Sequence, residues 1–187
     1  MELTDEGTWA EHQDGLCITL VRGMAASDVI ATLCPSDVQA FSSAEQAMGW
    51  VRGSASYDRT WLAVGHVDGS AFAWEDNGFQ GADHGVLQTL SGGTRAVSMF
   101  WNVNSVMAFT LADDGQVFRQ FDPLFHDDDP SPVAEIGSSL AEEAGLNWEA
   151  GPRLSGLRLQ ARLMCLDDDA NPDWLGLQGV TFWGHHF

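Results

Sequence analysis

The sequence predicts an α+β protein in which an antiparallel meander sheet has helices packed on one side. Short apolar runs rich in β-branched and aromatic residues recur along much of the chain. Asp-Gly dipeptides separate several of these runs, and such dipeptides accept the positive φ that tight hairpins need. Helical periodicity is confined to short segments and to the tail, which favours an α+β fold over an alternating one.

The first predicted elements are a strand and two helices. Residues 15–22 form an apolar run rich in β-formers, which predicts a buried strand. A short helix is expected to begin at a cap on Ser27. Ser42 and Glu45 have capping-box spacing and predict a second helix through about Val51.

The middle of the chain predicts antiparallel strands. Asp68-Gly69 separates two apolar runs and predicts a hairpin. A short helix is expected near residues 86–90. The strands expected in this region span residues 61–67, 70–75, 96–101, 106–111 and 116–121. The last of them is not cleanly apolar on either face, so the pattern leaves its buried face open.

The tail predicts two helices and a terminal strand. Apolar residues recur at helical spacing over 133–144, and Gly145 resembles a C-cap. Residues 157–163 favour a helix by composition, although their alternation also fits a strand. Residues 179–187 are expected to form a short strand.

At 187 residues the chain is expected to form a single domain, because one hydrophobic core can hold a chain of this size together. The predicted parts are a sheet-rich core over about 9–123, an acidic loop over 126–132 and a helical tail over 133–187.

The charge is strongly acidic. The chain has 27 Asp and Glu residues against 8 basic ones, a net charge of -19, and every basic residue is Arg. Scattered single arginines argue against nucleic acid or an anionic membrane as a partner, because neutralising phosphates needs clustered cations. A basic protein partner is the better electrostatic match. The charge also has a simpler interpretation, which is solubility alone.

The cysteines predict an intracellular protein. Cys17, Cys34 and Cys165 are odd in number, widely spaced and set in apolar runs, as expected of buried reduced thiols. The N-terminus is acidic and has no basic segment followed by an apolar one, so no signal peptide is expected. These features together favour a cytoplasmic location.

Several short motifs carry a family resemblance. They are Trp-Glu-Asp-Asn-Gly-Phe-Gln-Gly at 74–81, Leu-Ser-Gly-Gly-Thr at 90–94, Asn-Val-Asn at 102–104, Asp-Gly at 114–115 and Phe-Asp-Pro at 121–123. With these motifs, most of residues 9–123 resembles an actinobacterial family of acidic proteins labelled only as a domain of unknown function. The resemblance implies an actinobacterial source and a single α+β domain. It implies no catalytic residues, because no activity is attached to that family.

No metal site is predicted. His126 stands beside the acidic run 127–129, but consecutive loop residues point in different directions and lack the calcium-loop spacing. The run at 167–169 lacks it too. His185 and His186 would project to opposite faces of a strand, and no zinc-binding motif accompanies them.

No catalytic residue and no cofactor are predicted. Ser91 lacks the Gly-x-Ser-x-Gly elbow of serine hydrolases. The chain has no Lys, which excludes a P-loop, and no Gly-x-Gly-x-x-Gly motif is present.

The first functional hypothesis is therefore a protein-binding module for a basic partner, of the immunity or regulatory type. Trp148 and Trp174 lie in polar loops and are the predicted aromatic anchors. Asp127, Asp128 and Asp129 are the predicted acidic contacts.

Two other hypotheses remain open. One is a small-ligand binder or enzyme with a pocket over the sheet, formed by His66, Glu75, Asp76 and Ser91. The other is a structural component of a larger assembly. The sequence leaves the oligomeric state undetermined.

Overall fold

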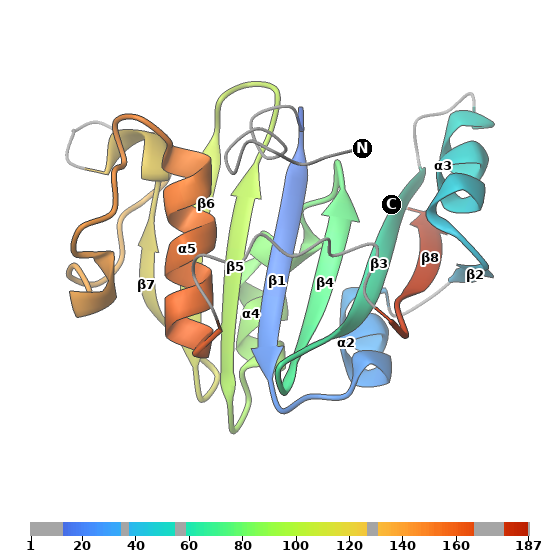
Figure 1. Cartoon of the computed structure of the whole chain (residues 1–187), viewed down its shortest axis with the longest axis horizontal. Coiled ribbons are helices and arrows are strands. Elements are labelled where there is room, and N and C mark those ends of the chain that lie inside the picture. The colour runs from blue at the N-terminus through green and yellow to red at the C-terminus, as the bar shows by residue number, and fades with distance from the viewer. Residues whose placement is uncertain (1–12, 35–37, 55–58, 127–130, 167–177, 187) are drawn as a thin grey trace.

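One antiparallel sheet organises the computed structural model of the chain (Figure 1). The structure describes residues 13–34, 38–54, 59–126, 131–166 and 178–186. The strands are β1 (Leu16–Arg22), β2 (Gln39–Phe41), β3 (Arg59–Val67), β4 (Ser70–Asp76), β5 (Arg95–Trp101), β6 (Met107–Asp113), β7 (Gln116–Phe121) and β8 (Thr181–His186). They are arranged across the sheet as β2-β8-β3-β4-β1-β5-β6-β7. The predicted antiparallel α+β fold is confirmed.

Strand β1 lies at the centre of the sheet. It pairs with β4 on one side and β5 on the other, so it separates the β3–β4 hairpin from the β5–β6–β7 meander. Residues Leu16 to Val21 are all buried. A central strand covered on both faces explains why this apolar run is continuous instead of alternating with polar residues.

Helices cover both faces of the sheet, so the prediction of helices on one side is wrong. The helices are α2 (Ala26–Leu33), α3 (Ala44–Arg52), α4 (His84–Leu90) and α5 (Pro152–Met164). Residues of α3 and α5 belong to the core cluster that includes Leu16 and Ile18, whereas α2 and α4 belong to the cluster that includes Val21. Figure 1 shows α5 in front of the sheet and α4 behind it. Residues on both faces of β1 are buried, so each face needs a cover.

The two N-terminal helices form as predicted, but with other caps. Helix α2 begins after Ala25, whose side chain makes no cap hydrogen bond, instead of at Ser27. Helix α3 is capped by Ser43, whose hydroxyl accepts from the Gln46 N–H at 3.3 Å. The Gln46 side chain in turn accepts from the N–H of Ser42. The cap is thus a Ser/Gln pair displaced by one residue from the predicted Ser/Glu pair.

The segment predicted as a helix over 133–144 is not one. Only η3 (Ala141–Glu143) is helical there, as a single 3-10 turn, and Ile136 forms an antiparallel bridge with Gln120 of β7. Residues 131–150, here called the strap, precede α5 and lie beside edge strand β7. Gly137 adopts φ +75°, which interrupts any helix at that position. The predicted helix at 157–163 and the predicted C-terminal strand are both present, as α5 and β8.

The cysteines are free, and two of the three are buried. Cys17 and Cys34 lie in the core, as predicted. Cys165 is exposed, contrary to the prediction. It caps α5 in a left-handed conformation with φ +59°, and that turn removes it from the helix face whose Leu163 and Met164 are buried. Within the described residues no helix has the length and apolar character that crossing a membrane requires.

Candidate functional site

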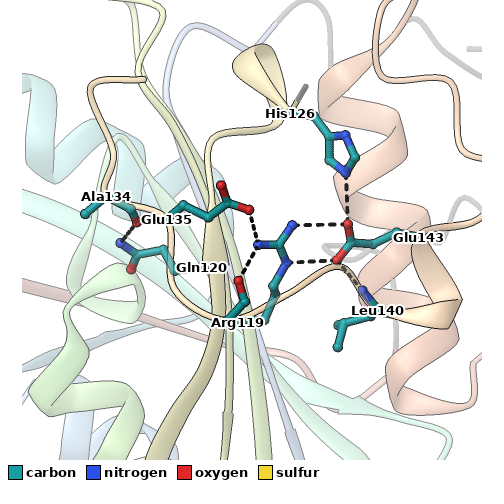
Figure 2. A network of polar contacts seen from close by, with 8 residues as sticks. Arg119, Gln120, His126, Ala134, Glu135, Leu140 and Glu143 are labelled. Atoms are coloured by element: carbon teal, nitrogen blue, oxygen red, sulfur yellow. Dashed lines mark hydrogen bonds and ion pairs between the residues drawn. The ribbon is translucent and has the colours of Figure 1, made fainter. Parts of the chain in front are cut away.

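A buried arginine lies at the centre of the candidate site. Arg119 is on β7, the edge strand, and its side chain is 1% exposed. Its Nε donates to Oε1 of Glu143 at 2.9 Å and its Nη2 donates to Oε2 at 3.2 Å, a bidentate pair (Figure 2). A buried guanidinium needs such pairing, because an unpaired charge in the interior is strongly destabilising.

Arg119 also binds the first half of the strap. Its Nη1 donates to Oε1 of Glu135 at 2.5 Å and lies 3.5 Å from the carbonyl oxygen of Gly137. Its guanidinium carbon lies 4.4 Å from the centroid of the Phe121 ring. One side chain thus joins the edge strand to two parts of the strap, the segment around Glu135 and the η3 turn, whereas the backbones of β7 and the strap pair through the bridge at Ile136.

The electrostatics of the pair follow from this arrangement. Burial by itself raises the pKa of Glu143, but the Arg119 guanidinium, the Leu140 N–H and His126 outweigh it and hold that pKa below its usual value. Burial by itself lowers the pKa of Arg119, and the carboxylates of Glu143 and Glu135 raise it above its usual value. Both shifts favour the ionised form, so the Arg119–Glu143 contact is an ion pair.

An aromatic stack covers Glu143. His126 Nε2 lies 2.8 Å from Oε2 of Glu143, and its ring stacks on Trp148 with centroids 4.6 Å apart and planes 9° apart. Trp148 also meets the Phe121 ring edge to face at 5.3 Å. Trp148 is half-buried, so one part of this predicted anchor remains accessible.

A pocket of about 410 Å³ lies next to this network. Its wall is formed by Phe121, Asp122, Phe125, His126, Ser131, Val133, Ala134 and Glu135. The wall therefore combines aromatic rings with two carboxylates and draws on the end of β7, η2 and the strap. Pockets of this size accommodate small ligands or single side chains.

Asp122 is the buried acid of the pocket wall and is 1% exposed. Its Oδ1 accepts from the N–H of Leu124 at 2.9 Å, which caps η2, whereas Oδ2 makes no hydrogen bond within the described part of the chain. Burial raises the pKa of Asp122, although hydrogen bonding by the backbone N–H groups of Leu124 and Met107 acts to lower it. A buried carboxylate oxygen without a donor is rare in native proteins and calls for a physical explanation.

Among the predicted partner-binding residues, the structure describes Trp148. Trp148 stacks on His126, and His126 directly precedes Asp127 in the chain. His126 and Ser131, which flank the acidic run, both line the pocket. Asp127, Asp128, Asp129 and Trp174 themselves lie outside the described residues.

The four residues predicted to form a pocket over the sheet do not lie together. Glu75 and Asp76 are consecutive on β4, so their side chains point to opposite faces, and Asp76 accepts from the Trp61 indole at 2.8 Å. His66 is exposed near the other end of the β3–β4 hairpin, with its Nε2 3.2 Å from the Met24 carbonyl oxygen. Ser91 caps the end of α4, where its hydroxyl accepts from the Gly115 N–H.

Glu75 instead belongs to a buried polar row on the α2/α4 face of the sheet. The sheet register pairs Glu75 with Cys17 of β1. Two positions further along β1, Thr19 is in register with Ser98, Thr110 and Gln120 on the next three strands. The carboxylate accepts from the N–H groups of Gln80 and Gly81 at 2.9 and 2.7 Å. Burial raises the pKa of Glu75 to about 7, although those two N–H groups and the Cys17 thiol favour its ionised form. The row is covered by η1 (Gln80–Ala82), so we interpret it as a structural feature.

Sequence reasoning missed the residues that hold the candidate site together. Arg119, Asp122, Glu135 and Glu143 are separated by up to 24 positions, and no motif joins them. One signal was present: Arg119 alternates with Val117 and Phe121 on one face of the predicted strand, and a lone Arg in such a position is a candidate for a buried pair. Among the residues that the structure describes, no group of three or more metal-ligating side chains is present.

The fold and the site define an α+β protein whose central antiparallel sheet carries a buried arginine–carboxylate site at one edge. The chain belongs to a family of unknown function, DUF6461, whose profile matches residues 4–150. That span includes the site residues from Arg119 to Trp148, whereas α5 and β8 follow it. Comparisons with curated proteins and with solved structures found no match.

Proposed function

We propose that the protein is a non-enzymatic binding module that engages a basic protein partner in the cytoplasm, as immunity-type or regulatory proteins do. One observation carries the proposal: the half-buried Trp148 stacks on His126, the residue that directly precedes the acidic run Asp127–Asp129. Aromatic anchors bordered by charges of one sign are typical of binding surfaces. The actinobacterial origin that the resemblance implies belongs to the same proposal.

The use of the arginines supports an acidic surface. Arg119 pairs with carboxylates inside the protein, and Arg95 pairs with Asp113 at 2.6 Å. Four more arginines donate to backbone carbonyl oxygens, namely Arg22, Arg59, Arg153 and Arg162. The few cations thus bind the chain to itself, whereas the chain has 27 acids. A field of this sign attracts a basic protein and repels nucleic acid.

The proposal is tested by capture of partners from the source cell, followed by binding kinetics at two salt concentrations. We expect a basic protein, and an association rate that falls steeply as salt is raised, because long-range attraction is screened over about 8 Å at physiological ionic strength. An acidic or nucleic-acid partner, or an association rate indifferent to salt, would contradict the proposal.

Two variants separate steering from anchoring. Replacing Asp127, Asp128 and Asp129 by Asn should lower the association rate more than it raises the dissociation rate. The matched control replaces Asp167, Asp168 and Asp169 by Asn, which removes the same charge from another part of the chain. Trp148→Ala should act mainly on the dissociation rate.

The pocket over the sheet loses its support, because His66, Glu75, Asp76 and Ser91 lie apart. Nothing in the described residues favours the structural-component hypothesis over a binding module. The pocket beside Arg119 offers a different site for a ligand.

A further inference from the structure

We propose that the pocket beside Arg119 binds a guanidinium group, supplied by an arginine side chain of the basic partner. The inference rests on the proposed function for the source of the guanidinium. The choice of a guanidinium as the bound group follows from the pocket alone. The pocket has a carboxylate oxygen that the described residues leave unsatisfied, an excess of negative charge and aromatic walls.

The unsatisfied carboxylate belongs to Asp122. The residue is buried in the pocket wall, and its Oδ2 has no hydrogen bond within the described residues. A buried acceptor without a hydrogen bond is destabilising, so this oxygen would be stabilised by a donor that the described residues do not supply. A cationic donor entering the pocket satisfies both the hydrogen bond and the charge.

The charge balance selects a cation over an anion. Arg119 is already bound bidentately by Glu143. Glu135 accepts from the same guanidinium through Oε1, its side chain is 61% exposed, and it lines the pocket. The charge of Arg119 is balanced by that of Glu143, which leaves the carboxylates of Asp122 and Glu135 without a cation of their own among the described residues. An entering anion would meet two carboxylates, whereas a cation would be stabilised by both.

The aromatic walls favour a guanidinium over an ammonium. Phe121, Phe125 and His126 line the pocket, and a planar guanidinium stacks on such rings. The described residues already contain such contacts, with Arg119 over Phe121 at 4.4 Å, Arg59 over Trp50 at 4.6 Å and Arg153 over Trp101 at 5.5 Å. A guanidinium also has five N–H donors in a fixed fork, which can reach two separate carboxylates, whereas an ammonium acts as a point charge.

The test uses the full chain and the capped tripeptide acetyl-Gly-Arg-Gly-amide, titrated while the Trp148 indole resonance is followed by NMR. Two comparison peptides carry citrulline, which has nearly the same shape without charge, and lysine. We expect the arginine peptide to bind at least about tenfold more tightly than the citrulline peptide and more tightly than the lysine peptide. Equal binding of the arginine and citrulline peptides would overturn the proposal.

Variants locate the binding. Asp122→Asn should weaken the arginine peptide about tenfold, because the charge is lost but the cap on Leu124 is kept. Glu135→Gln should weaken it by a smaller factor, since that side chain is exposed. The matched control Asp68→Asn removes one charge from an exposed hairpin turn and should leave binding unchanged. If Asp122→Asn and Glu135→Gln both behaved like Asp68→Asn, the pocket would not be the site.

The outcome separates this inference from the proposed function, because peptide binding is measured without the partner. Arginine-peptide binding that depends on Asp122, with no basic protein captured from cells, would keep the guanidinium site and refute the proposed function. Capture of a basic partner whose affinity is the same for Asp122→Asn would do the reverse. Free arginine binding more tightly than the peptide would assign the pocket to a small molecule and overturn the partner side chain.

Discussion

Arg119 and Glu75 are both buried ionisable side chains, and the protein satisfies them in different ways. Arg119 has two carboxylate partners, one of them bidentate. Glu75 has no cation within hydrogen-bond distance among the described residues, and its carboxylate relies on the backbone N–H groups of Gln80 and Gly81. Backbone dipoles compensate less of the desolvation than a full charge does, so burial raises the pKa of Glu75 to about 7.

Glu75 therefore makes stability depend on pH. Its folded pKa is about 7 and its ordinary value is 4.5, so the stabilisation is complete below pH 4.5 and is lost as the pH rises through 7. At about 1.4 kcal/mol per pKa unit the loss is on the order of 3 kcal/mol. We expect the free energy of unfolding of the wild type, measured with urea, to fall by about this amount between pH 5 and pH 8. The Glu75→Gln variant has no titrating group at this position and should not show this loss.

The Glu75→Gln variant also shows which result would contradict this prediction. Glutamine has one acceptor oxygen for two N–H groups, so Glu75→Gln should be the less stable protein at pH 5, and the gap should narrow toward pH 8. Parallel pH profiles for the two proteins would show that Glu75 does not titrate in this range.

The three thiols should differ sharply in reactivity. Burial raises the pKa of Cys34 to about 12 and that of Cys17 well above its usual value, with the Glu75 carboxylate adding to both shifts. Cys165 is exposed. We expect a thiol reagent at pH 8 to label one thiol per native chain rapidly, because only an accessible thiolate reacts. The control Cys165→Ser should show no rapid labelling, and rapid loss of all three thiols would contradict the buried positions of Cys17 and Cys34.

At the scale of elements, the strap depends on a close approach to β7. A Cβ at Gly137 would overlap the carbonyl oxygen of Phe118, and Gly137 also has φ +75°. Gly145, in the same strap, has φ +77° but no atom within 4 Å of the corresponding position. Substitution of Gly145 therefore tests the effect of the positive φ alone, whereas substitution of Gly137 adds a steric overlap with β7.

We expect Gly145→Ala to cost about 1 kcal/mol of unfolding free energy, from the positive φ alone. Gly137→Ala should cost about 3 kcal/mol or more, because the strap must also move away from β7. The measurement is equilibrium urea unfolding of both variants. Equal losses would mean that the strap does not lie against the edge strand as described.

At the scale of the whole molecule, a net charge of -19 opposes compaction. The Arg119 ion pair offsets part of this repulsion, and it is buried, where salt screens it little. We expect the melting temperature to rise by several degrees between about 20 and 300 mM NaCl, as repulsion among surface carboxylates is screened. Replacing chloride by sulfate at equal ionic strength controls for ion-specific effects. A melting temperature that falls over this range would show that attractive surface pairs dominate.

The features that could be predicted from sequence are the local ones. The β3–β4 hairpin follows from Asp68-Gly69, the central strand from the apolar run at 16–21, and α5 from its composition. Each depends on the conformational preferences of neighbouring residues, which are present in any context. The acidity of the molecule is likewise a property of composition.

Contacts between distant segments could not be predicted in this way. Sequence periodicity predicted a helix over 133–144, but the bridge between Ile136 and Gln120 and the pairing of Glu135 and Glu143 with Arg119 hold this segment against β7 instead. The same contacts create the pocket and enclose Asp122 in its wall. The physical reason is that a buried charge is stabilised only by partners brought to it in space, and those partners need no fixed spacing along the chain.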